Sequence, residues 1–253
     1  MNNIQPGDLI LKVGDRNDFV DALIIEGAHI TNPYFPEDKI PTHCVPTFPI
    51  DENFINVMLE KFAITDTDYP DSREWIKKHL YGKPAVGGTG IIEMKANGLC
   101  GGAIESSDYL NAKNIFVLEP VISWNAMALK QLSVWGAFYF KHQIPYDYLI
   151  YPEQAEKIGL GWILHKLFGL PIECSPWLGE TTDIEGFKDE SQWKQECIEL
   201  GERMINWACF GQGISKCFTG NVNDSQPIEA LEKCLGSTPF FRVKKDSPLQ
   251  LNN

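Results

Sequence analysis

The sequence lacks long apolar segments and clusters of positive charge. No segment approaches the roughly 18–20 consecutive apolar residues that a membrane-spanning helix needs, and residues 1–8 lack the basic start and apolar stretch of a signal peptide. The chain has 22 Lys and Arg against 34 Asp and Glu, a net charge of -12, and such a surface repels nucleic-acid phosphates and anionic lipids. We therefore expect no membrane span and no nucleic-acid partner, and a location in the cytoplasm, or in a host's cytoplasm if the gene is viral.

Cysteine spacings typical of zinc sites or disulfide frameworks are also missing. The number of cysteines is odd, no two form a Cys-x-x-Cys pair, and no histidine pair stands beside them at zinc-finger spacing. We therefore expect no metal, no cofactor and mostly free, buried thiols. The seven positions are Cys44, Cys100, Cys174, Cys197, Cys209, Cys217 and Cys234. The glycine-rich run at residues 87–90 lacks the Lys-Ser/Thr of a phosphate-binding loop, which favours a flexible connection over a nucleotide site.

What the chain does contain is typical of a globular domain. Its 253 residues, 43% of them apolar and 22% charged, are enough to bury a large core. The sequence has no repeat, low-complexity tract or linker, so we expect one domain over residues 1–253. Short apolar runs predict strands at residues 9–11, 45–50, 91–94 and 115–118.

Helical signals are concentrated in the second half of the chain. Ser123 or Asn125 can cap a helix that runs to about His142, and the tail from Ser237 is expected to be irregular. The other predicted helices cover residues 18–28, 53–62, 71–81, 152–168 and 191–210. The order of strands first and helices afterwards predicts an α+β fold. Prolines 46 and 49 would confine the strand at residues 45–50 to an edge of the sheet.

Cys197 is a candidate nucleophile because it lies near the start of the helix predicted at residues 191–210. The N-terminus of a helix favours a thiolate, although the neighbouring Glu196 and Glu199 oppose it. The same residue falls on the apolar stripe of that helix, so a buried structural thiol is the alternative. Cys174 is a second candidate, although the proline two residues later favours a loop there.

Five histidines could supply a base for such a thiol, and sequence spacing alone does not choose among them. His43 precedes the strand predicted at residues 45–50, a rigid position from which to direct an imidazole. Glu93 lies inside the apolar strand at residues 91–94. An acid in that position either faces solvent or has a function.

Four segments, in this order, resemble the permuted papain-like amidases of the YiiX and YaeF type, which are relatives of the NlpC peptidases. The first is Pro-Gly-Asp-Leu-Ile-Leu at residues 6–11, and the second is Pro-Thr-His-Cys-Val at residues 41–45. The third is the strand and turn at residues 91–98. The fourth pairs Tyr-Asp-Tyr at residues 146–148 with Cys-Ile-Glu-Leu at residues 197–200.

This resemblance implies a circularly permuted papain-like fold, with an antiparallel sheet packed against helices. It further implies that Cys197 is the nucleophile, that His43 is the general base and acid, and that Glu93 orients His43. Tyr146 would lie near the pocket and help to bind the oxyanion. The implied activity is that of a cysteine hydrolase or acyltransferase on amide or ester bonds, with a small-molecule, peptide-like or lipid-linked acyl substrate.

The chain departs from the family pattern in three places. Cys-Val-Pro at residues 44–46 follows His43, where the family has a glycine. Ile198 replaces the serine that is common after the nucleophile. About forty residues are inserted at residues 51–90, where the family has a short connection. We interpret the insert as a lid or a specificity element. The departures also leave open a catalytically inactive binding or host-interaction protein, with the insert as its contact surface.

Overall fold

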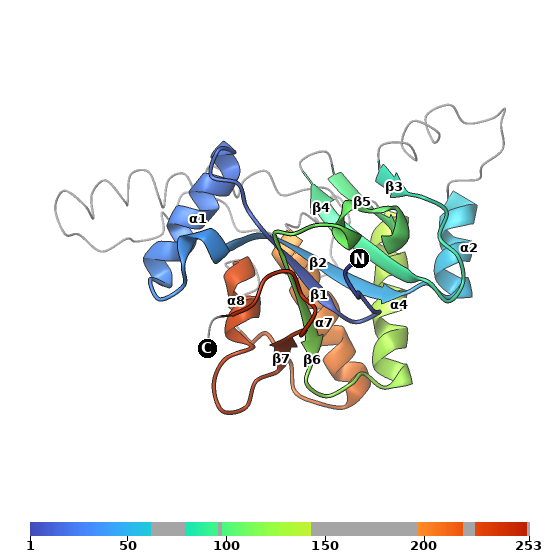
Figure 1. Ribbon diagram of the computed structural model, residues 1–253. Helices are drawn as coiled ribbons and strands as arrows, with labels where there is room; N and C mark the ends of the chain where they lie inside the picture. Colours follow the sequence, from blue (N-terminus) through green and yellow to red (C-terminus); the bar gives the residue numbers. More distant parts are fainter. Residues whose placement is uncertain (62–78, 96–97, 143–196, 220–225, 252–253) are drawn as a thin grey trace, which may run out of the picture.

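The computed structural model describes residues 1–61, 79–95, 98–142, 197–219 and 226–251 (Figure 1). They form an α+β fold with a sheet packed against helices, as predicted, and the sheet has seven strands. The strands are β1 (Leu9–Val13), β2 (Pro41–Pro49), β3 (Leu80–Tyr81), β4 (Thr89–Lys95), β5 (Gly98–Ala103), β6 (Ile115–Pro120) and β7 (Phe241–Val243). The helices are α1 (Phe19–Thr31), α2 (Glu52–Lys61), α4 (Ala126–His142), α7 (Cys197–Gln212) and α8 (Pro227–Glu232). Within the described part of the chain, no helix has the length and apolar character needed to cross a membrane.

The strand order is β3-β5-β4-β2-β1-β6-β7. Every neighbouring pair is antiparallel except β3 and β5, which run parallel. The sheet is therefore mixed, and the prediction of a wholly antiparallel sheet was wrong in this respect. β5 pairs with β4 on one side, and β3 adds to its other side in the same direction as β5.

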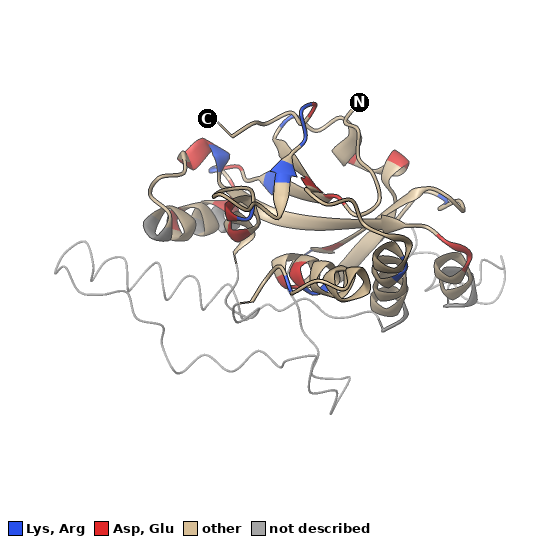
Figure 2. Cartoon of the chain, turned by 90° about the horizontal axis from the view of Figure 1, so that it is seen from below, with Lys and Arg blue, Asp and Glu red and all other residues tan. Residues whose placement is uncertain are grey.

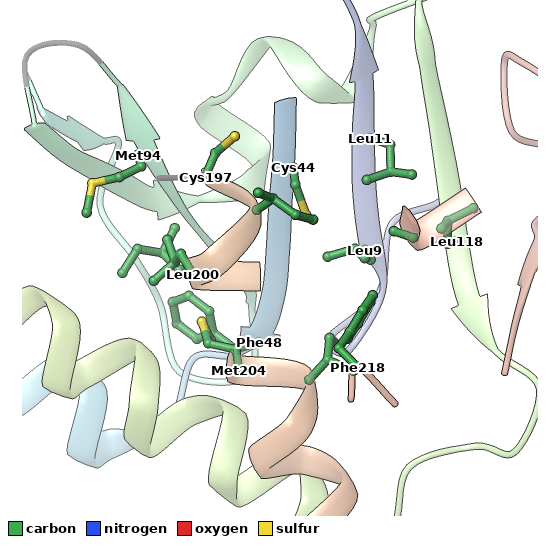
Figure 3. Close-up of a cluster of buried hydrophobic side chains, with 14 of the residues drawn as sticks. Leu9, Leu11, Cys44, Phe48, Met94, Leu118, Cys197, Leu200, Met204 and Phe218 are labelled. Atoms are coloured by element: carbon green, nitrogen blue, oxygen red, sulfur yellow. The ribbon is translucent and has the colours of Figure 1, made fainter. Parts of the chain in front are cut away.

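Two apolar clusters form on the sheet because successive strand residues point to opposite faces. Leu9 and Leu11 belong to the larger cluster, which includes residues of α4 and α7, whereas Ile10 belongs to the smaller one. Figure 3 shows Leu200 and Met204 of α7 gathered around Phe48 of β2 in the larger cluster. Figure 2 shows the sheet from its edge, with both chain ends on one side and helices on the other.

Several local signals in the sequence are confirmed. The backbone N–H of Ala128 donates to Asn125 Oδ1 at 2.8 Å, so Asn125 caps α4, which ends at His142. The strand signals at residues 91–94 and 115–118 lie within β4 and β6. The helix predicted at residues 152–168 lies outside the described residues.

Three local predictions were wrong because pairing with distant strands overrode the local signal. Residues 80–81 were predicted at the end of a helix, yet they form β3 on the edge of β5. The tail was expected to be irregular, yet residues 241–243 form β7 on the edge of β6. The strand at residues 45–50 was expected at an edge, yet β2 lies between β1 and β4.

The position of Pro46 explains how β2 tolerates an interior place. The N–H of Thr47 donates to the carbonyl of Asp8 on the β1 side, at 3.0 Å, so the nitrogen of Pro46 faces the β4 side. The ladder with β4 begins only at Thr47, which is opposite Ile91. No ladder hydrogen bond is therefore lost at Pro46, and before it β2 pairs with β1 alone.

A glycine sets the distance between α7 and β2. A Cβ atom on Gly201 would lie 2.6 Å from the Sγ of Cys44 and 3.5 Å from Cδ1 of Leu9. The first distance is too short for a real contact, so only a residue without a side chain allows this approach. Cys197 lies one turn before Gly201, and the close packing therefore brings its thiol next to β2.

We expect Gly201→Ala to destabilise the protein through this contact, by about 1–2 kcal/mol, since overpacking outweighs the gain in helix propensity. In a Cys44→Ala background the obstructing sulfur is gone. There, Gly201→Ala should be neutral or stabilising by up to about 1 kcal/mol. Urea unfolding of the four proteins in this cycle measures the effect. An equal loss in both backgrounds would show that Cys44 does not set the helix–strand distance.

Candidate active site

Beyond the point where the β2–β4 ladder ends, a side-chain interaction joins the two strands. The Nε2 atom of His43 on β2 lies 2.8 Å from Oε2 of Glu93 on β4. The side chain of Glu93 is 0% exposed and that of His43 is 19% exposed. The alternative in which Glu93 faces solvent is therefore wrong. The carboxylate instead binds the imidazole of His43, the residue that the resemblance expects it to orient.

The Glu93 carboxylate accepts from four donors, two at each oxygen. Oε2 lies 2.8 Å from Nε2 of His43 and accepts a hydrogen bond from the phenol of Tyr109 at 2.6 Å. Oε1 accepts a hydrogen bond from the phenol of Tyr81 at 2.6 Å and forms an ion pair with the ammonium of Lys95 at 3.0 Å. An ionised carboxylate has about four acceptor positions, so this buried charge is fully satisfied.

These donors keep the carboxylate ionised. Burial raises the pKa of Glu93, but the hydrogen bond and charge of His43, together with Lys95 and Tyr109, outweigh it and lower the pKa to about 2. Burial, and then the negative charge of Glu93, raise the pKa of the phenols of Tyr81 and Tyr109. Both tyrosines therefore stay protonated and remain donors.

Cys197 completes the arrangement from the third element, α7. The residue is 6% exposed, and its Sγ lies 4.0 Å from the carbonyl oxygen of Thr42. In Figure 3 the sulfur points away from Leu200 and Met204, which lie farther along the same helix.

Cys197 also interacts with the ring of His43. Burial lowers the pKa of His43, but the charge and hydrogen bond of Cys197, and then those of Glu93, raise it to about 10. The structure thus brings together the three residues that the sequence proposed as nucleophile, base and orienting acid. Cys197 belongs to the larger apolar cluster as well, as the alternative of a structural thiol predicted.

The other described cysteines have different surroundings. Burial raises the pKa of Cys100 and Cys209 to about 11 and that of Cys234 to about 12, and it raises the pKa of Cys217 further. These four thiols therefore stay protonated at neutral pH. The six described cysteines form no disulfide. In the same part of the chain, no group of three or more His, Cys, Asp or Glu side chains is suited to a metal ion.

Two residues named by the sequence analysis, Tyr146 and the rival nucleophile Cys174, lie outside the described residues. Three residues of the site were missed. Lys95 could have been found, because it follows Glu93 by two positions on one strand and so shares its face. Tyr81 and Tyr109 carry no local signal, since each reaches Glu93 only through the pairing of distant segments.

The chain was also compared with known proteins. No protein-family model matches it, and neither a curated protein nor a solved structure does so. The site is therefore defined by its own geometry, and the resemblance to permuted papain-like amidases rests on the motifs given above.

The shifted pKa values predict how the His43–Glu93 pair stabilises the fold at different pH. The pKa of Glu93 lies below its ordinary value of 4.5, so its contribution is present above pH 4.5 and is lost as the pH falls towards about 2. The pKa of His43 lies above its ordinary value of 6.5, so its contribution is full below pH 6.5 and is lost as the pH rises towards about 10. Glu93 supplies only part of the rise in the pKa of His43, after Cys197, and the contributions of His43 and Glu93 are both full between pH 4.5 and 6.5.

Urea unfolding of the parent protein and Glu93→Gln, measured near pH 3, 5.5 and 9, checks this expectation. The difference in unfolding free energy should be largest near pH 5.5. A matched control is Glu119→Gln, which removes an exposed ion pair with Arg242 and should change stability by less than about 1 kcal/mol. A Glu93→Gln difference that is constant across this range would contradict the ion pair.

Proposed function

We propose that this protein is a cysteine hydrolase or acyltransferase that acts on amide or ester bonds. In this proposal Cys197 is the nucleophile, His43 the general base and acid, and Glu93 the group that orients His43. The observation that carries it is the contact of one imidazole with both a buried carboxylate and a thiol. A nucleophile next to a base that a third group orients is the arrangement that activates a weak nucleophile.

The first step in this mechanism is the transfer of the Cys197 proton to His43. The Nε2 atom of His43 binds Glu93, which leaves Nδ1 to accept the proton from the thiol. The charge of the thiolate, and then that of Glu93, raise the pKa of His43 and so hold the transferred proton on the imidazole. The product is a thiolate beside an imidazolium, held in place by a carboxylate.

The thiolate then forms a bond to the carbonyl carbon of the substrate. Backbone N–H groups, including that of Cys197, would stabilise the oxyanion. When the oxyanion collapses, the C–N or C–O bond breaks and His43 gives its proton to the leaving amine or alcohol. Water then gives a proton to His43 and attacks the thioester, which releases a carboxylic acid and restores the thiol. In a transferase, another alcohol, amine or thiol takes the place of water.

The order of these parts along the chain supports a permuted papain-like fold as the framework. The histidine strand β2 precedes the cysteine helix α7, the reverse of the order in ordinary papain-like enzymes. From the family resemblance we propose peptide-like amides or lipid-linked acyl groups as substrates. The net charge of -12 argues against a free polyanion.

The described residues of the insert, 51–61 and 79–90, contribute to the core and to the site. Phe54 of α2 is fully buried and contacts the rings of Phe48 and Phe140, and Tyr81 of β3 binds Glu93. The described part of the insert thus belongs to the core and to the site. Deleting it would remove both contributions and would not separate partner binding from hydrolysis.

The proposal predicts selective alkylation of Cys197. With iodoacetamide near pH 6, where ordinary thiols are mostly protonated, Cys197 should react faster than the other cysteines. His43→Asn should slow its alkylation by about tenfold or more, because the proton acceptor is lost. Peptide mass spectrometry resolves the rate at each cysteine. Cys100→Ala, which removes a thiol near Glu93, serves as the control and should leave the Cys197 rate unchanged. Faster reaction at another cysteine would argue against this nucleophile.

Turnover provides the second test. Hydrolysis of p-nitrophenyl esters and peptide p-nitroanilides by the parent protein should fall by about a thousandfold or more in Cys197→Ala, because no covalent intermediate can form. The far-ultraviolet spectrum and thermal midpoint should stay close to those of the parent. Full activity in a folded Cys197→Ala protein would remove Cys197 from the mechanism.

A further inference from the structure

The four donors to Glu93 differ in where they come from. Tyr81, which binds Oε1, lies on the two-residue edge strand β3 and is half-buried. Lys95, which binds the same oxygen, is 45% exposed. Tyr109, by contrast, is buried and shares Oε2 with His43. The carboxylate is therefore held between a solvent-side pair of donors and an interior pair.

The phenol of Tyr109 is held firmly by its surroundings. Its ring belongs to the smaller apolar cluster, with Ile104 and Ile115. Its carbonyl accepts from the side-chain amide of Asn2 at 2.8 Å, and that amide also donates to the carbonyl of Ala112 at 2.9 Å. The chain around Tyr109 is thus tied to residue 2, and the direction of the phenol is fixed from both ends.

We propose that Tyr109 is a positioning residue, which holds Oε2 of Glu93 against the ring of His43. The inference rests on the proposed thiol chemistry, since it assigns a role within that site. Without the Tyr109 hydroxyl, the two donors at Oε1 would be opposed only by His43. The carboxylate would then turn towards Tyr81 and Lys95, and the imidazole would lose its charged partner.

A purely structural role for Tyr109 predicts something different. If the phenol only fills the core, Tyr109→Phe keeps the ring, and the state of His43 does not change. If the phenol only competes with His43 for Oε2, its removal strengthens the His43–Glu93 bond and stabilises the imidazolium. The direction in which the titration of His43 moves therefore separates positioning from both alternatives.

The experiment is an NMR titration of the full chain labelled with ¹³C at Cε1 of histidine. The resonance of His43 is assigned by its loss in His43→Asn. In the parent its midpoint should lie near the raised pKa of about 10. In Tyr109→Phe the midpoint should fall by about one pH unit or more, a tenfold loss in the preference for the imidazolium. An unchanged or higher midpoint would overturn the proposal.

Two further tyrosine variants are matched controls. Tyr81→Phe removes a phenol from Oε1 and leaves more negative charge for His43, so the midpoint should stay the same or rise. Tyr34→Phe removes a phenol that donates to Glu232 at 2.7 Å, on an exposed surface, and should leave the midpoint unchanged. A fall of equal size in Tyr81→Phe would mean that the number of donors matters rather than their placement, which would also overturn the proposal.

A second variant covers the case in which Tyr109→Phe does not fold. Asn2→Ala loosens the backbone of Tyr109 but keeps the phenol, and it should lower the His43 midpoint in the same direction by a smaller amount. No shift in a folded Asn2→Ala protein would then count against positioning. The titration needs no substrate, so it decides the role of Tyr109 even if Cys197 proves unreactive. Selective alkylation of Cys197 with no effect of Tyr109→Phe would refute this inference alone.

Discussion

The site depends on one buried charge, the carboxylate of Glu93. A carboxylate removed from water is costly unless each of its acceptor positions is filled, and here the four donors come from four separate elements: β2, β3, β4 and the short 3-10 helix η3 (Asp108–Leu110). Because each donor offsets part of the cost of burying this charge, the contacts tie these elements to one another. The orientation of His43 follows from these contacts.

Two residues near the site lack a group that other residues have: Pro46 has no N–H, and Gly201 has no side chain. Pro46 has no N–H to offer β4, and the ladder between the two strands ends beside it. His43 lies on the part of β2 that pairs with β1 alone, and there its imidazole binds the side chain of Glu93. Gly201 has no side chain, and α7 approaches β2 closely enough for its thiol to reach the same imidazole.

The insert takes part in the same network. Through Tyr81 it supplies a donor to Glu93, and through Phe54 it adds to the core between the sheet and α4. A change in this segment would therefore affect the electrostatics of the site as well as the stability of the fold. This holds for the described residues of the segment, 51–61 and 79–90.

Much of the local structure, and the three residues that meet at the site, could be predicted from the sequence. The cap at Asn125 and the strand containing Glu93 follow from side-chain type and short-range pattern, whereas the candidate roles of His43 and Cys197 came from the resemblance to permuted papain-like amidases. The tertiary structure alone decided that β2 is an interior strand, that residues 80–81 and 241–243 join the sheet, and that two tyrosines bind Glu93. The physical reason is that a strand edge or a buried charge is satisfied by whichever segment reaches it in space. A short-range sequence pattern does not show which distant segment will reach a given strand edge or buried charge.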